Sequence, residues 1–71
     1  MRRAKAFANL GSSQAKQNNV AAAIASYNQA LAISEFQGLN RANVLFSLGI
    51  SQVELKYFAG AIASYKEALA I

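Results

Sequence analysis

The residue types that carry acid–base or metal chemistry are scarce in this sequence of 71 residues. It contains no His, Cys or Asp, and its only carboxylates belong to Glu35, Glu54 and Glu67. Catalytic triads, thiol nucleophiles and zinc sites each need one of the missing residue types. The three glutamates fall in different predicted helices, so they do not supply the paired acid and base of a hydrolytic site. We therefore expect no enzymatic activity, no cofactor and no bound metal.

The basic residues offer a different chemistry, the binding of phosphate groups in nucleic acids. Seven basic residues against three acidic ones give a net charge of +4. Nucleic-acid binding typically needs cations gathered on one face with aromatic residues among them, but only Arg2, Arg3 and Lys5 cluster here. A modest positive charge more often serves solubility. A basic nucleic-acid accessory is therefore the third of three functional hypotheses.

The chain is small and apolar, which limits how it can be stable. Hydrophobic residues make up 55% of it and charged residues 14%, against about 25% charged in ordinary soluble domains. Domains below roughly 70–80 residues usually need disulfides, a metal or a partner subunit. Since the first two are excluded, we expect a homo-oligomer or a longer parent chain.

No segment has the pattern of a membrane span or a targeting signal. The uncharged stretch between Lys16 and Glu35 is interrupted by Gln, Asn and Ser residues, whereas a bilayer span needs about 20 mainly apolar residues. The opening residues contain Arg2 and Arg3, but no apolar stretch follows them, and they belong to the repeat described next. We expect a cytoplasmic protein that does not bind membranes.

The strongest feature is an internal repeat. Residues 1–33 align with residues 39–71 at a shift of 38 positions, and about half of the aligned pairs are identical. The run Ala-Ile-Ala-Ser-Tyr occupies residues 23–27 and returns at residues 61–65. A period of about 20–50 residues is typical of stacked supersecondary units. We predict a single domain over residues 1–71, with repeat one at about 4–37 and repeat two at about 42–71.

Each unit has the pattern of two helices, because its apolar and small residues recur at the three-four spacing of one helical face. Asn19 is suited to be an N-cap whose side-chain oxygen accepts from the backbone of a second helix starting at Val20. Gly38 is suited to end that helix in the left-handed conformation. We predict the third helix from about Asn40 to Leu55 and the fourth from about Phe58 to the end.

This pattern resembles the tetratricopeptide repeat, whose signature is Trp-x-x-Leu-Gly-x-x-Tyr, then Ala-x-x-x-Phe, a small Ala and a closing Pro. The chain has Phe7-x-x-Leu10-Gly11-x-x-Gln14, Ala23-x-x-x-Tyr27 and Ala30, and again Leu45-x-x-Leu48-Gly49-x-x-Gln52, Ala61-x-x-x-Tyr65 and Ala68. The resemblance implies an all-α fold of two stacked antiparallel helix-turn-helix repeats, a fragment of an α-solenoid. It also implies that the small residues lie where helices cross closely, while Phe7, Leu10, Tyr27 and Tyr65 fill the core.

Three features depart from that signature. The period is 38 instead of 34, the closing Pro is absent, and Gln14 and Gln52 replace the usual Tyr. Four extra residues make about one more helical turn. Longer variants of this family have an extended second helix and a Gly-containing link, which we expect here. The turn at Lys56–Tyr57 also lacks the usual glycine.

The resemblance implies a ligand site as well, because the first helix of each repeat lines a concave groove that holds a peptide. The residues carried over to that groove are Lys5, Ala8, Asn9, Ser12 and Lys16, and Asn43, Phe46, Ser47, Ile50, Val53 and Glu54. Asn9 matches the family asparagine that forms a hydrogen bond with the backbone of the ligand, and Ser47 stands at the equivalent place in the second repeat. The alternative interpretation is that Asn9 is a solvated helix residue without a binding role. Some members of the family bind chaperone tails through a clamp for two carboxylates, which needs a Lys where this chain has Ala8 and an Asn where it has Ser12. We therefore do not expect that specificity. The leading hypothesis is a protein-interaction module.

A second apolar row, Phe46, Ile50 and Val53, follows one side of the third helix. A helix that is apolar on two sides must be covered on both. Either more chain or a second copy covers this row, or an apolar peptide or amphipathic helix binds it with an acidic residue at Lys5 or Lys16.

The second functional hypothesis is a structural unit that assembles with itself. The last helix ends at Ile71 without a polar capping helix, and Ile62 has no following helix to pack on. Because stacked repeats generally need three or more units, we expect a homo-oligomer through the uncapped C-terminal helix. A closed twofold dimer is favoured over a head-to-tail stack, which risks fibres.

Overall fold

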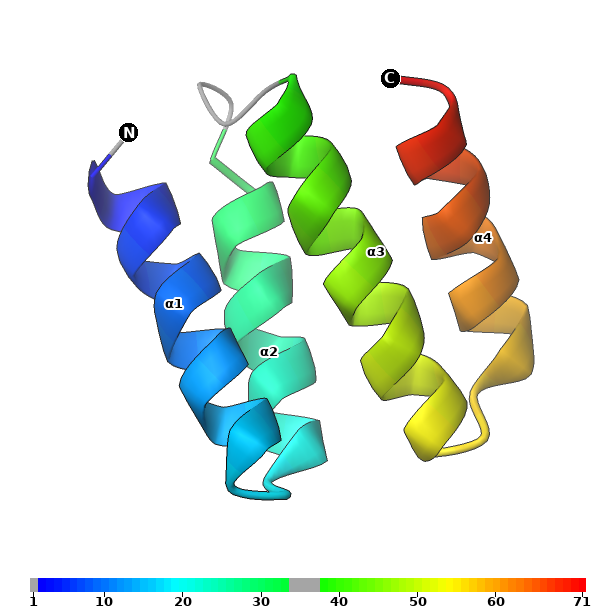
Figure 1. Ribbon diagram of the computed structural model, residues 1–71, viewed down its shortest axis with the longest axis horizontal. Helices are drawn as coiled ribbons and strands as arrows, with labels where there is room; N and C mark the ends of the chain where they lie inside the picture. Colours follow the sequence, from blue (N-terminus) through cyan, green and yellow to red (C-terminus); the bar gives the residue numbers. More distant parts are fainter. Residues whose placement is uncertain (1, 34–37) are drawn as a thin grey trace.

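The computed structural model describes residues 2–33 and 38–71. They form four α-helices: α1 (Arg2–Lys16), α2 (Val20–Leu31), α3 (Leu39–Glu54) and α4 (Phe58–Leu69). The helices stand side by side in chain order, with α1 and α4 on the outside (Figure 1). Helix α1 packs on α2, α3 packs on α4, and α2 joins the two pairs by packing on α3. The predicted all-α fold of two stacked antiparallel helix pairs is confirmed.

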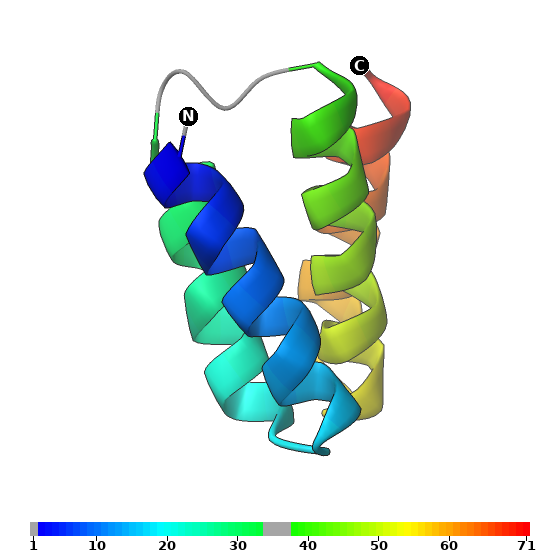
Figure 2. The ribbon, with the colours of Figure 1, turned by 60° about the vertical axis from the view of Figure 1, so that its left-hand side comes forward.

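In the turned view, α1 stands in front of α2 and α3 in front of α4 (Figure 2). The first helices of the two repeats therefore lie on one side of the molecule and the second helices on the other. Helices α1 and α3 touch each other only weakly. None of the four helices is both long enough and apolar enough to cross a membrane, as far as the described residues extend.

The turns inside the two pairs have the same geometry. The Asn19 N–H donates to the Gln14 carbonyl over 2.8 Å, and the Tyr57 N–H donates to the Gln52 carbonyl over 2.7 Å. Each of these six-to-one hydrogen bonds closes a Schellman motif. In this motif the residue just before the N–H donor adopts a positive φ. That residue is Asn18 (φ 63°) in the first turn and Lys56 (φ 64°) in the second. The second turn therefore lies where predicted, although a lysine occupies the place that favours glycine.

Two predicted caps are wrong in detail. Asn19 is at the N-cap position of α2 with φ −92° and ψ 70°, but its side chain makes no capping hydrogen bond. N-cap side chains normally accept such a bond from an extended backbone, whereas the ψ of Asn19 is set by the turn that its N–H closes. Gly38 does have a positive φ of 70°, but its ψ is −144° and it precedes α3 as its N-cap.

The expected extension of the second helix is also absent. Helix α2 ends at Leu31 with 12 residues, as many as α4. The Ile33 N–H donates to the Ala30 carbonyl at 3.2 Å, an i to i−3 bond that tightens and closes a helix end. The additional residues of the long period therefore follow α2, and residues 34–37, with Glu35, lie outside the described part of the chain.

Small residues allow the helices to approach closely, as predicted. The core joins α1, α2 and α3 and consists of Ala4, Ala23, Tyr27, Ala30, Val44 and Leu48. A Cβ on Gly11 would come within 2.6 Å of Tyr27 Cε1, and a Cβ on Gly49 within 2.5 Å of Tyr65 Cε1. Each tyrosine ring therefore lies on a glycine of the neighbouring helix.

Three residues expected in the core are not fully buried: Phe7, Leu10 and Tyr65. Leu10 is 48% exposed although its repeat equivalent Leu48 is only 4% exposed. Tyr27 is buried, whereas Tyr65 is only half-buried. The reason is the stack itself: among the described helices, α3 packs between α2 and α4, whereas α1 packs mainly on α2 and α4 packs only on α3.

Candidate functional site

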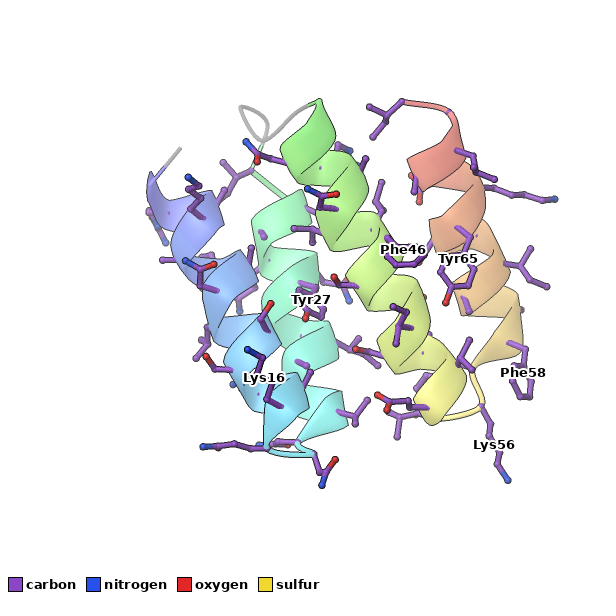
Figure 3. The ribbon with its side chains drawn as sticks, in the orientation of Figure 1. Lys16, Tyr27, Phe46, Lys56, Phe58 and Tyr65 are labelled. Atoms are coloured by element: carbon purple, nitrogen blue, oxygen red, sulfur yellow. The ribbon has the colours of Figure 1, made fainter. Side chains whose placement is uncertain are left out.

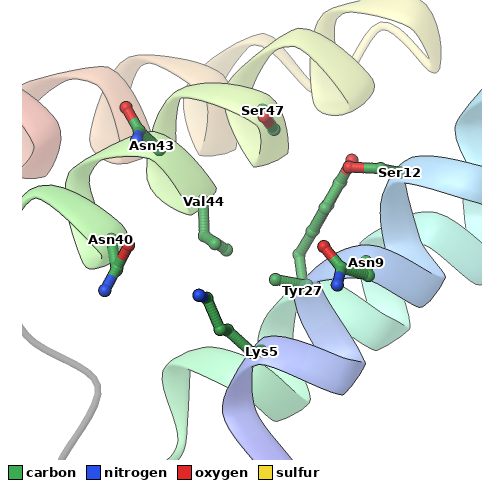
Figure 4. Close-up of a pocket in the computed structure, with 9 residues that line it drawn as sticks. Lys5, Asn9, Ser12, Tyr27, Asn40, Asn43, Val44 and Ser47 are labelled. Atoms are coloured by element: carbon green, nitrogen blue, oxygen red, sulfur yellow. The ribbon is translucent and has the colours of Figure 1, made fainter. Parts of the chain in front are cut away.

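A groove opens between the first helices of the two repeats, α1 and α3, with α2 beneath it (Figure 4). Its volume is about 190 Å³. The described residues that line it are Lys5, Ala8, Asn9 and Ser12 from α1, Tyr27 from α2, and Asn40, Asn43, Val44 and Ser47 from α3. Both walls thus come from the equivalent helix of each repeat.

Most lining side chains are polar and hold both a hydrogen-bond donor and an acceptor. Asn9 and Ser12 stand on the α1 wall, and Asn40, Asn43 and Ser47 stand on the α3 wall (Figure 4). Asparagine and serine can each donate and accept, which is what an unpaired peptide backbone requires. Tyr27 and Val44 are buried and supply an apolar base. The groove therefore suits a segment with an exposed backbone.

Lys5 is the one charged side chain among the described lining residues. Its amine extends from α1 toward the α3 wall (Figure 4). A single ammonium group without an acidic neighbour in the lining makes this end of the groove attractive to a carboxylate.

The structure brings together only part of the predicted ligand face. Six of the residues predicted to face the groove line it: Lys5, Ala8, Asn9, Ser12, Asn43 and Ser47. Lys16, Ile50, Val53 and Glu54 are exposed but do not line it. The binding role of all these residues stays a prediction.

Phe46 belongs to a second, apolar pocket between α3 and α4. Its lining consists of Phe46, Tyr65, Ala68 and Leu69, and its volume is about 290 Å³. The rings of Phe46 and Tyr65 lie beside each other with centroids 5.7 Å apart and planes tilted by 48° (Figure 3). That distance is within the range of attractive aromatic pairs.

The sequence analysis missed Tyr27, Asn40 and Val44 as lining residues. Asn40 and Val44 lie one helical turn from Asn43 and Ser47 on α3, so the three-four spacing of that helix carried the signal. Tyr27 was assigned to the core, and its ring does fill the core while its edge reaches the groove.

The charged groups outside the groove are spread over several elements in the described part of the chain. Lys16 lies near the end of α1, and Lys56 extends outward from the turn between α3 and α4 (Figure 3). Arg41 donates from Nη1 to the Leu31 carbonyl over 3.0 Å and so caps α2. Glu54 and Glu67 are exposed on different helices. Across residues 2–33 and 38–71, no three metal-ligating side chains come together.

Comparison with known proteins adds one match. Residues 4–37 match the family model described as tetratricopeptide repeat. No curated protein and no solved structure matches the chain. Repeats of this family generally mediate protein–protein interaction and are typically non-catalytic. Since the first helix pair matches that model and the second repeats its sequence and its turn geometry, the chain belongs to the tetratricopeptide repeat family.

Proposed function

We propose that this chain is a non-catalytic protein-interaction module that binds a peptide segment or helix of a partner in the groove between α1 and α3. The observation that carries the proposal is the set of polar side chains on both walls, Asn9 and Ser12 facing Asn43 and Ser47. An extended peptide has backbone N–H and C=O groups that need partners, and these side chains provide them without demanding a particular sequence.

Lys5 gives the proposed ligand a chemical preference. Because it is the charged group of the described lining, a peptide with an acidic residue near one end gains a charge-assisted contact. Phe46 and Ile50 extend the surface on the other side of α3, where both are exposed. A ligand with an apolar side chain next to its backbone contacts would cover this row.

A peptide library displayed on phage and selected on the full chain tests the proposal. Selected peptides should carry an acidic residue. In NMR spectra of the chain, adding such a peptide should shift the amide signals of the groove residues. Asn9→Ala and Asn43→Ala should each weaken binding by about five- to tenfold, because each removes one net hydrogen bond. Asn28→Ala is the matched control, since Asn28 is an exposed asparagine of α2 outside the groove.

Charge and apolar contacts are tested separately with the same peptides. Lys5→Glu should weaken binding most, with an effect that shrinks in added salt. Ile50→Lys should weaken binding while the helical content stays unchanged. If no selected peptide depends on Asn9, Asn43 or Lys5, the groove is not the site.

Nucleic acid is the competing ligand for a chain of net charge +4. A labelled single-stranded oligonucleotide should bind weakly or not at all at 150 mM salt. Tight binding that falls steeply with salt concentration would mark phosphate contacts and contradict the proposal.

A second candidate function is self-association, favoured by the exposed apolar face of α4. Leu69 is 84% exposed and Ile62 is 55% exposed, and their spacing puts them on one face of α4. Exposed apolar patches of this kind mark interaction sites. Sedimentation over a wide range of concentration tests it, and a stable monomer throughout would contradict it. We also propose that the protein is cytoplasmic, which cell fractionation checks.

A further inference from the structure

The contact between the two repeats inside the chain provides a template for contacts outside it. Helix α3 places Val44 and Leu48 in the core that it shares with α2, where Ile24 and Leu31 pack against that core. At the end of α2, Arg41 Nη1 donates to the Leu31 carbonyl at 3.0 Å. The contact therefore combines an apolar face with one arginine-to-carbonyl hydrogen bond.

Helix α4 presents the α2 side of this contact a second time. At the shift of 38 positions, Ile62 corresponds to Ile24 and Leu69 to Leu31. Both are largely exposed, and Leu69 also lines the apolar pocket with Phe46, Tyr65 and Ala68. No other described helix than α3 packs on α4, so this surface is complete but uncovered.

Helix α1 presents the α3 side of the same contact. Arg3 corresponds to Arg41 and Leu10 to Leu48, and both pairs are identical in residue type. Arg3 is exposed and Leu10 is 48% exposed. The position of Val44 is taken by Ala6, which is also exposed. Helix α1 thus keeps the arginine and leucine of the contact and has a smaller residue at the third position.

We infer that two copies of this chain stack head to tail, with α1 of one copy on α4 of the other. Leu10 of the second copy would pack on Ile62 and Leu69, as Leu48 packs over α2. Arg3 would donate to the Leu69 carbonyl, as Arg41 donates to the Leu31 carbonyl. Helix α1 begins and α4 ends at the same end of the molecule, on opposite outer sides (Figure 1), as this continuation requires.

Head-to-tail packing differs from the closed twofold dimer that the sequence alone favoured. A twofold dimer buries the same surface of both copies, whereas a head-to-tail contact joins two different surfaces and leaves one of each free. The exposed Leu10 and Arg3 have a role in the second arrangement and none in an α4-to-α4 dimer. The inference rests on the self-association proposal and is independent of peptide binding in the groove.

Two blocking variants of the full chain separate these arrangements. Leu69→Lys blocks the α4 surface and Leu10→Lys blocks the α1 surface; because both residues are exposed, each variant should keep its helical content and thermal transition. In sedimentation velocity each variant alone should be monomeric where the wild type associates. An equimolar mixture should form a one-to-one heterodimer, because each variant retains the surface that the other lacks.

Two further variants test the details of the contact. Ala6→Val restores the residue of the internal contact and should tighten association by roughly tenfold, from about two buried methylene equivalents. Arg3→Ala should weaken association severalfold. Lys16→Ala is its control, since it removes a positive charge from an exposed residue of α1 that does not line the groove.

The outcomes are distinct. A heterodimer in the mixture and monomers in the separate samples support head-to-tail stacking. If Leu10→Lys still dimerises and only Leu69→Lys does not, self-association stands but the head-to-tail inference is wrong. If the wild type is monomeric at every concentration, both self-association and this inference are wrong, while peptide binding in the groove is unaffected.

Discussion

The hydroxyl of Ser64 donates a hydrogen bond to Gln52 Oε1 across 2.7 Å, and Ser26 repeats this contact with Gln14 Oε1 at 2.6 Å. Each bond ties the second helix of a repeat to the first. Both serines are buried, so the glutamines that replace the family tyrosine serve as their acceptors. In each repeat, the glutamine in place of the family tyrosine is therefore accompanied by a serine that donates to it.

Ser26→Ala and Gln14→Met should each lower the free energy of unfolding by about 1 kcal/mol, because each leaves one polar group of a part-buried bond without its partner. The double variant should lose clearly less than the sum of the two. Urea unfolding of the four proteins gives the coupling energy, expected at about 0.5–1.5 kcal/mol. Strict additivity would show that the bond contributes nothing.

Lys56→Gly should stabilise the chain, because Lys56 has φ 64° and the left-handed conformation costs a residue with a Cβ about 1–2 kcal/mol. Part of the gain is offset by the greater freedom of glycine in the unfolded chain. A net gain near 1 kcal/mol would raise the melting temperature by roughly 4–8 °C in a domain of this size.

Lys56→Ala is the control for the loss of the lysine side chain, and it should leave the melting temperature nearly unchanged. Asn18→Gly should gain less than Lys56→Gly, because asparagine tolerates a positive φ better than lysine does. Equal effects of Lys56→Gly and Lys56→Ala would show that backbone strain is not the cause.

Ala30→Arg should unfold the chain or destabilise it by several kcal/mol, because Ala30 has no exposed surface in the core between α2 and α3. Overpacking costs about 1–3 kcal/mol before the burial of a charge is added. Ala32→Arg is the matched control, since Ala32 is exposed two residues later, and it should change stability by no more than about 0.5 kcal/mol. Circular dichroism melting distinguishes them, and equal curves would mean that Ala30 is not in the core.

The four helices and their pairing followed from the sequence because the repeat shows each element twice. The family resemblance predicted that Gly11 and Gly49 lie at close helix crossings and that Tyr27 and Tyr65 fill the core, whereas the contact of each ring with its glycine comes from the structure. Six groove residues could be placed because the family resemblance implies that the first helix of each repeat lines a groove, as α1 and α3 do here.

Burial could not be derived in the same way. Leu10 and Leu48 have the same residue type and the same glycine after them, yet one is half exposed and the other is buried. The difference comes from the neighbours of each helix in the stack, which no local pattern contains. The missing side-chain cap of Asn19 has a similar origin, since the turn that closes α1 determines its ψ angle.

Two glycines of the second repeat should respond to alanine in opposite ways. Gly49→Ala should destabilise the chain by about 1–3 kcal/mol, because its Cβ would lie 2.5 Å from Tyr65 Cε1 and the ring is held on α3.

Gly60→Ala should stabilise the chain by up to about 1 kcal/mol through helix propensity. Its Cβ would meet the Gln52 side chain, with Nε2 at 2.9 Å and Cδ at 3.4 Å, and no backbone atom is among these contacts. The first repeat supports this, because Ala22 holds the equivalent position of α2 while Gln14 keeps its bond to Ser26. Thermal melts of the two variants decide the matter: if Gly60→Ala were as damaging as Gly49→Ala, Gln52 would be fixed in place and the opposite signs expected here would be wrong.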